Sequence, residues 1–144
     1  MCDVGYGMKD SVGGYDISGA SGHKTCQHLE VYRIAHRLGV AIHGFSLRLP
    51  KFELYEPGSQ LRRSSKSVSA NIVEGFCRRR YKAEFIRFLV FAHASCNEAI
   101  EWVEYVRDCH PDLREGAKGI LDKLDELGRK LNRFILAVGR DHKS

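Results

Sequence analysis

The stretch QLRRSSKSVSANIVEGFCRRR, residues 60–80, places small side chains between two groups of arginines. Its core-type residues recur every three or four positions, which predicts one stripe of an amphipathic helix. That stripe consists of Leu61, Ser65, Val68, Ile72 and Phe76. Pro57 is predicted in the first turn of this helix, and Gly75 is predicted to end it. Because serine competes for backbone hydrogen bonds, the stability of the helix must come from packing.

Three further segments have the same helical period. The first spans about 28–48 and ends at Leu49-Pro50, because the residue before a proline avoids the helical conformation. The others span about 82–108, which ends at His110-Pro111, and about 112–138. Their predicted stripes are Val31, Ile34, Leu38, Ala41 and Phe45; Phe85, Phe88, Ala92, Ser95, Ala99, Trp102 and Val106; and Leu113, Ala117, Ile120, Leu124, Leu127, Leu131, Phe134 and Val138.

Four amphipathic helices with short connections predict an all-α fold, an antiparallel up-down-up-down four-helix bundle over residues 26–140. No segment has the period of two that would predict a sheet. Residues 1–25 contain six of the 14 glycines and no apolar period, so we expect them to form a flexible Gly-rich N-terminal tail. The 144 residues suit a single domain.

The five cysteines are widely spaced and form no CxxC pair, which argues against a disulfide framework or a zinc site. Reduced thiols are typical of a cytoplasmic protein. No apolar run is long enough for a transmembrane helix, and the N-terminus does not have the pattern of a signal peptide. We therefore expect a cytoplasmic protein with no membrane contact.

The net charge of +5 is unevenly distributed over the predicted bundle. The end built from 27–38, 68–94 and 127–144 has twelve basic and four acidic residues, a net charge of +8. The opposite end, 39–67 and 95–126, has nine basic and eleven acidic residues, a net charge of −2. Arginine forks suit phosphates, and aromatic side chains can stack on unpaired bases. The basic end therefore predicts nucleic-acid binding, with RNA as the first candidate.

The predicted nucleic-acid contacts are Arg78, Arg79, Arg80, Lys82, Arg87, Arg129, Lys130 and Arg133. Two alternatives remain for the same charges, namely an acidic protein partner and a solvated end without a specific role.

A second stripe of mostly small residues lies beside the core stripe of the helix that begins near Pro57. It consists of Ser64, Ser67, Asn71 and Glu74, and it predicts a contact surface between subunits, because small side chains allow a neighbouring helix to approach closely. The alternative is that these side chains are solvated.

An enzymatic role is not expected. The chain has no Glu-x-x-His pair of the kind that builds di-iron sites in helical bundles. It also has no P-loop, GxGxxG or GxSxG motif. Glu74 lacks a nominated second carboxylate or histidine with which to perform acid–base catalysis. We therefore predict no catalytic residue, no metal site and no cofactor.

Two stretches carry a family resemblance: LPKFELYEPGSQLRRSSKSVSANIVEGF, residues 49–76, and AEFIRFLVFAHASCNEAIEWV, residues 83–103. They resemble the four-helix-bundle proteins encoded by intervening sequences in bacterial 23S rRNA genes, over about 27–137. The matching positions are Pro50, Glu53, Ser59, Gln60, Leu61, Arg62, Arg63, Ser67, Asn71, Ile72, Glu74, Gly75, Glu84, Phe85, Arg87, Phe88, Leu89, Ala92, Ser95 and Glu98. The chain departs from the family pattern at Pro57-Gly58, Tyr81 and His93-Ala94, so sites at these positions are not carried over.

The resemblance implies a left-handed bundle that assembles into a homopentamer and has no established enzymatic activity. A related branch, the accessory proteins of diversity-generating retroelements, binds nucleic acid and works with a reverse transcriptase. The residues do not assign the chain to either branch. The expected function is therefore that of a non-enzymatic, homo-oligomeric protein that binds nucleic acid or serves as an adaptor to a nucleic-acid enzyme such as a reverse transcriptase. The alternative is a protein-binding scaffold without nucleic-acid contact.

Overall fold

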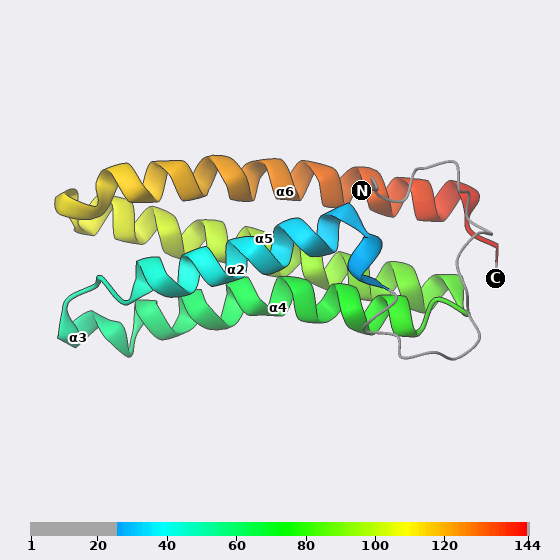
Figure 1. The fold of residues 1–144 in the computed structure, drawn as a ribbon, viewed down its shortest axis with the longest axis horizontal. Helices are drawn as coiled ribbons and strands as arrows, with labels where there is room; N and C mark the ends of the chain where they lie inside the picture. Colours follow the sequence, from blue (N-terminus) through cyan, green and yellow to red (C-terminus); the bar gives the residue numbers. More distant parts are fainter. Residues whose placement is uncertain (1–25, 144) are drawn as a thin grey trace.

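The computed structural model describes residues 26–143, and four long helices make up most of them (Figure 1). The long helices are α2 (Glu30–Ser46), α4 (Pro57–Cys77), α5 (Lys82–Cys109) and α6 (Arg114–Asp141). Three short elements connect or precede them: η2 (Cys26–His28), α3 (Lys51–Leu54) and η3 (Pro111–Leu113). No strand occurs within the described residues, so the all-α prediction is confirmed. The predicted N-terminal tail lies outside the described residues.

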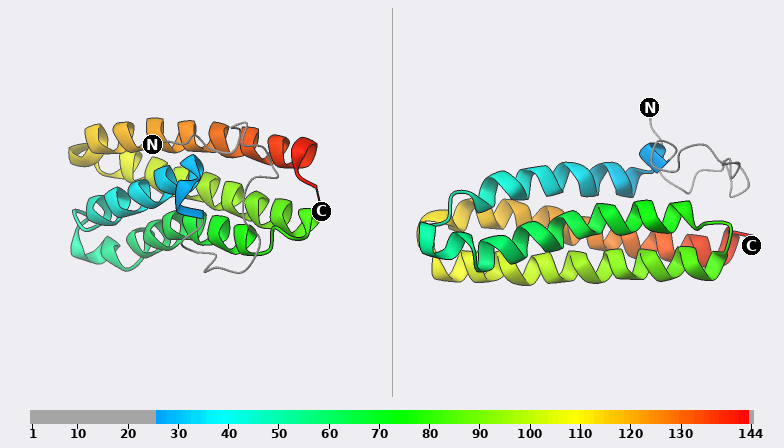
Figure 2. Two further views of the ribbon diagram at one scale, coloured as in Figure 1. Left: turned by 45° about the vertical axis from the view of Figure 1, so that its right-hand side comes forward. Right: turned by 90° about the horizontal axis from the view of Figure 1, so that it is seen from below.

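The four long helices form a closed square in which sequential helices are neighbours. α4 packs between α2 and α5, α5 also packs on α6, and α6 returns to α2. Figures 1 and 2 show the helices running side by side along one long axis. The turn between α4 and α5 lies at one end with the last turn of α6, and we call this the turn end. α3 and the α5–α6 connection lie at the opposite end, called the α3 end (Figure 1).

The predicted core stripe of α4 is confirmed, because Leu61, Ser65, Val68, Ile72 and Phe76 are all at most 3% exposed. The stripes of α5 and α2 are confirmed in part. Buried as predicted are Phe85, Ala92, Ala99 and Val106 of α5 and Val31, Leu38 and Phe45 of α2. The α5 stripe also includes Leu89, Cys96 and Val103, whereas the predicted Phe88, Ser95 and Trp102 are only partly buried. In α2, Ile42 is buried and the predicted Ala41 is exposed. The difference follows from topology, because the buried face of each helix points between its two neighbours.

The ends of the helices follow proline more closely than glycine. α4 begins at Pro57, and α5 stops at Cys109 immediately before His110-Pro111, as predicted. The prediction that Gly75 ends α4 is wrong. The helix continues to Cys77, and the backbone N–H of Arg78 still donates to the carbonyls of Glu74 and Gly75.

A cluster of aromatic rings closes the turn end of the core. Phe85 is fully buried at its centre, and its ring centroid lies 6.2 Å from that of Phe76, 5.9 Å from that of Phe134 and 5.4 Å from that of His142. The ring of His28 meets Phe76 from η2, edge to face at 5.8 Å. Residues from η2, α4, α5, α6 and the segment after α6 therefore meet beneath the α4–α5 turn.

None of the helices between residues 26 and 143 has the combination of length and apolar composition that a bilayer-spanning helix requires.

Candidate nucleic-acid interface

The α4–α5 turn carries three consecutive arginines on a tightly hydrogen-bonded backbone. After Cys77, the N–H of Arg79 donates to the carbonyl of Phe76, and the N–H of Tyr81 donates to that of Arg78. Helix α5 then starts at Lys82. Because the turn is so short, the three arginine side chains leave it in different directions and have different environments.

The Arg79 side chain points back into the protein. It is only 7% exposed, and its guanidinium carbon lies 3.9 Å from the centroid of the Phe76 ring. One guanidinium nitrogen donates to the carbonyl of Phe76 at 2.7 Å, and a ring nitrogen of His142 lies 2.6 Å from the Arg79 carbonyl oxygen. Arg79 therefore holds the turn against the aromatic cluster and offers little of its side chain to a ligand, and its predicted contact with nucleic acid stays a prediction.

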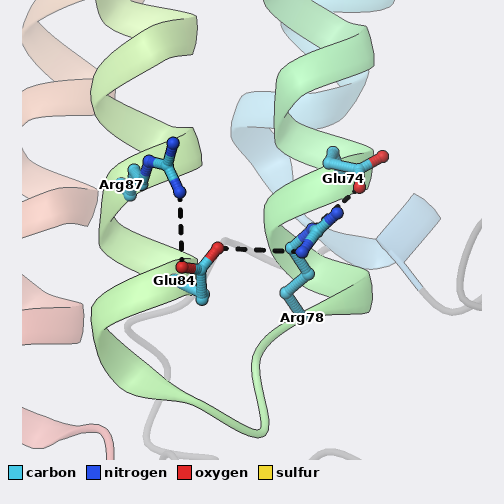
Figure 3. Close-up of polar contacts among 4 residues, drawn as sticks. All are labelled: Glu74, Arg78, Glu84 and Arg87. Atoms are coloured by element: carbon cyan, nitrogen blue, oxygen red, sulfur yellow. Dashed lines mark hydrogen bonds and ion pairs between the residues drawn. The ribbon is translucent and has the colours of Figure 1, made fainter.

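Arg78 belongs to a chain of ion pairs on the outer edge between α4 and α5 (Figure 3). Its Nε lies 2.8 Å from Glu74, and another of its guanidinium nitrogens lies 3.7 Å from Glu84. Glu84 in turn pairs with Arg87 at 3.4 Å. The guanidinium groups of both arginines also lie over the Phe88 ring, at 4.9 Å and 5.8 Å from its centroid. Exposed pairs of this kind contribute about 0–1 kcal/mol each, so a phosphate can compete for these arginines.

At the tip of the turn, the positive charge is less neutralised by carboxylates. Arg80 is exposed and takes no part in the ion pairs among residues 26–143. The Tyr81 side chain beside it is 61% exposed. A depression of about 350 Å³ is lined by Cys77, Arg78, Arg79, Arg80, Tyr81 and Glu84. The turn and its flanks hold the basic residues 78, 79, 80, 82 and 87 and the acidic residues 74 and 84, a net charge of +3.

The three α6 residues of the predicted site lie on a different part of the surface. Lys130 pairs with Glu30 of α2 at 3.2 Å, which places it on the α2–α6 side of the square. Arg129 pairs with Asp125 within α6, and Arg133 is exposed. Arg78 and Arg87 instead occupy the α4–α5 side, which is the opposite side of the square. The predicted contact residues are therefore spread over different sides of the bundle rather than forming one continuous patch.

The second stripe of α4 is used largely within the bundle. Ser64 is only 4% exposed and its hydroxyl donates to the carbonyl of Leu61. The Ser67 hydroxyl is 3.0 Å from that of Ser95 on α5, and the Asn71 amide donates to the Ser67 carbonyl at 2.9 Å. Glu74 pairs with Arg78. The small side chains therefore allow α5 to approach α4 in the same chain, and Ser64 is not available to a second subunit.

Cys26 lies buried near the turn, close enough to Cys77 and Arg79 for their charges to act on its pKa. Burial, and secondarily the neighbouring Cys77, raises the pKa of Cys26 to about 11. Burial also raises the pKa of Cys96 to about 11. Both side chains therefore remain neutral thiols near pH 7, where they pack as small apolar groups. No group of three His, Cys, Asp or Glu side chains suited to a metal ion occurs within residues 26–143.

Sequence reasoning missed the partners of the turn rather than the turn itself. The spacings Glu74–Arg78 and Glu84–Arg87 are four and three residues, which is the spacing of side chains that pair on one helix face. These pairs could have been predicted. No local spacing predicts the stacking of Arg79 on Phe76 or the contact of His142 with the turn, because both depend on tertiary packing.

The fold and this site define a small all-helical bundle with an arginine-rich turn at one end. The family model of the 23S rRNA-intervening sequence protein matches residues 27–133, so the chain belongs to that family. The match covers all four long helices apart from the last turns of α6. A search of curated proteins finds no match to the chain.

Proposed function

We propose that this protein binds RNA through the α4–α5 turn and has no catalytic role of its own. The observation that carries the proposal is the depression at the turn, where Arg78 and Arg80 lie beside the exposed ring of Tyr81. Arginine binds phosphate oxygens with two parallel hydrogen bonds, and an exposed aromatic ring offers a stacking surface to an unpaired base. This combination favours single-stranded or looped RNA over a regular duplex.

The proposal can be tested with a double variant, Arg78→Ser with Arg80→Ser. Arg79 is left in place because it is buried under the turn and its loss would disturb the fold. Affinity for a single-stranded RNA should fall about tenfold or more. The slope of log affinity against log salt should become shallower by about 0.7 for each phosphate contact that is lost. The reduction should be similar for unrelated RNA sequences, because phosphate contacts do not read bases.

The matched control is Arg63→Ser, which removes an exposed arginine from the same helix. Arg63 lies roughly 24 Å from the turn at 1.5 Å per residue, so RNA affinity should hardly change. If the control variant loses as much affinity as the double variant, or if the double variant keeps its salt slope, the turn is not the RNA site. A protein-binding scaffold, the alternative function, would show little RNA binding and a flat salt response.

We also propose that the protein forms a homo-oligomer through the α4–α5 face, with family membership as the first support. On this face Phe91 is 41% exposed, and its ring meets Phe88 at 5.3 Å between centroids. The partly buried side chains of Ser67, Asn71 and Ser95 lie along the same two helices. A small-residue surface beside an exposed aromatic ring suits helix packing between subunits.

Native mass spectrometry at low micromolar concentration tests this assembly, with a pentamer as the expected species. Phe91→Glu should shift the population to monomers, because an unpaired charge buried in an interface is costly. Leu136→Glu is the control, since Leu136 is an exposed apolar residue of α6, 61% accessible, away from this face. A wild-type protein that is monomeric at this concentration, or a Phe91→Glu variant that assembles normally, contradicts the proposal.

A cytoplasmic location is proposed on the free thiols of Cys26, Cys77, Cys96 and Cys109. A nucleic-acid enzyme such as a reverse transcriptase as a protein partner remains a prediction.

A further inference from the structure

The α3 end of the bundle contains a cavity of side-chain size. It measures about 200 Å³ and is lined by Glu53, Pro57, Trp102, Tyr105, Val106 and Cys109. Pockets that hold drug-sized ligands are typically about 300–1,000 Å³, so this cavity suits a single side chain better than a whole cofactor. Its walls are mostly apolar, and Glu53 of α3, whose carboxylate is hydrogen-bonded to His110, contributes a charged side chain.

Two aromatic rings line this cavity, and two more lie on the neighbouring α3. The rings of Trp102 and Tyr105 lie 5.9 Å apart between centroids, and Tyr105 is 53% exposed. On α3, Phe52 and Tyr55 are each 75% exposed. Single exposed apolar residues are ordinary, but four aromatic residues gathered at one end of a small domain mark an interaction surface. The indole N–H of Trp102 donates to Glu98 at 3.2 Å, which fixes the ring that lines the cavity.

The same region is strongly acidic. Residues 50–60 and 98–112 contain seven acidic and two basic side chains, a net charge of −5 with histidine neutral. One of the two basic side chains, Arg107, is already paired with Asp108 at 2.7 Å. Basic side chains also lie at this end, because Arg62 donates to the carbonyl of Leu54 and Arg114 lies near enough to Asp108 to interact with it. The acidic surface is therefore the part of α5 beside the cavity, which carries Glu98, Glu101, Glu104 and Asp108. A partner at this end must bring positive charge and a group that packs on aromatic rings.

We propose that the α3 end binds an arginine-containing basic segment of a protein partner, with one arginine side chain inserted beside Trp102 and Tyr105. A guanidinium is planar and weakly hydrated, so it stacks on aromatic faces better than a lysine ammonium does. The carboxylates around the cavity supply the opposite charge and acceptors for the N–H groups. The inference does not depend on RNA binding, because it concerns the other end of the molecule.

The test uses Trp102 as its own reporter, since it is the only tryptophan in the chain. The full-length protein is titrated with a peptide of alternating arginine and glycine, which contains no aromatic residue. The emission of Trp102 should change and saturate, and the anisotropy of a labelled copy of the peptide should give the same dissociation constant. A lysine–glycine peptide of equal length should bind at least several-fold more weakly, and a glutamate–glycine peptide should not bind.

Two variants locate the site. Tyr105→Ala removes an exposed ring, and Glu101→Gln removes an exposed carboxylate one helical turn before it. Each should weaken the arginine peptide about tenfold in the anisotropy assay while leaving the circular dichroism and the RNA affinity unchanged. Tyr81→Ala and Asp141→Asn are the matched controls, because they remove an exposed tyrosine and an exposed carboxylate at the turn end. They should leave peptide affinity unchanged.

Three results would overturn the proposal. The first is the absence of a saturable response of Trp102 to the arginine peptide. The second is equal affinity for the arginine and lysine peptides, or equal loss of peptide affinity in the site and control variants. Either result would mean that the peptide binds by general charge attraction. The third is an oligomer of the free protein that Tyr105→Ala dissociates, because the surface would then be occupied by a second copy of the chain.

Discussion

Phe85→Ala is expected to lower the free energy of unfolding by about 3–5 kcal/mol, the range measured for large aromatic side chains removed from a core. Phe85 is fully buried, and its ring meets the rings of Phe76, Phe134 and His142. Those neighbours come from α4, α6 and the segment after α6, so they cannot all close the cavity by one helix movement. Much of the cavity will therefore remain open, and its cost adds to the lost apolar burial.

Urea unfolding followed by the fluorescence of Trp102 measures this loss. The control is Phe52→Ala, which removes the same side chain from α3 at a position that is 75% exposed. It should cost less than about 1 kcal/mol, since surface substitutions away from special contacts have small effects. Equal losses in the two variants would mean that the cluster at the turn end is not tightly packed.

Phe85 also connects the core to the proposed RNA site. The His142 ring that packs on Phe85 also hydrogen-bonds to the carbonyl of Arg79, and Arg79 itself lies over Phe76. The position of the arginine turn thus depends on the order of the aromatic cluster beneath it. The sequence indicated an exposed basic turn but not this support, because the participating residues are separated by up to 63 positions in the chain.

Helix number, helix ends near proline and the fold class were all predictable, because they depend on local period and local backbone sterics. The exact buried face of α5 was predictable only in part. The spacing that places Phe88, Ser95 and Trp102 on one stripe places Leu89, Cys96 and Val103 on a neighbouring one. Only the positions of α4 and α6 on either side of α5 decide which stripe points inward.

The sequence predicted how far along the bundle the candidate site lies. It did not predict on which side of the bundle its residues lie. Counting charges by position along the bundle axis grouped Arg78 and Arg87 with Lys130, although they lie on opposite sides of the closed square. The pairing of Lys130 with Glu30 joins residues 100 positions apart and has no local signal. Charge along an axis therefore identifies the basic end, and side-chain packing decides which of its arginines can meet a ligand.

Gly75 shows how the same residue type can serve two purposes that the sequence does not distinguish. A glycine near the end of a helical pattern predicts a terminating residue, because glycine accepts a left-handed conformation. Here the helix continues past it to Cys77. An added Cβ would lie 3.1 Å from the Cβ of Phe88 and 3.2 Å from the carbonyl oxygen of Phe85. Gly75 is therefore required by the close approach of α4 and α5, not by a change of backbone conformation.

Gly75→Val is accordingly expected to destabilise the protein by about 2–3 kcal/mol, the upper part of the range for overpacking a tight contact. The carbonyl of Phe85 belongs to the backbone of α5 and cannot rotate away, so the two helices must separate. Gly119→Val is the matched control. Gly119 lies within α6, and an added Cβ there meets nothing within 4 Å. Valine has a somewhat better helix propensity than glycine, so this variant should stay within about 0.5 kcal/mol of the parent.

Chemical unfolding of both variants measures the difference. Two small and similar changes would show that α4 and α5 can move apart without cost, whereas a large loss confined to Gly75→Val identifies this glycine as the contact that brings the arginine turn and the first turns of α5 together.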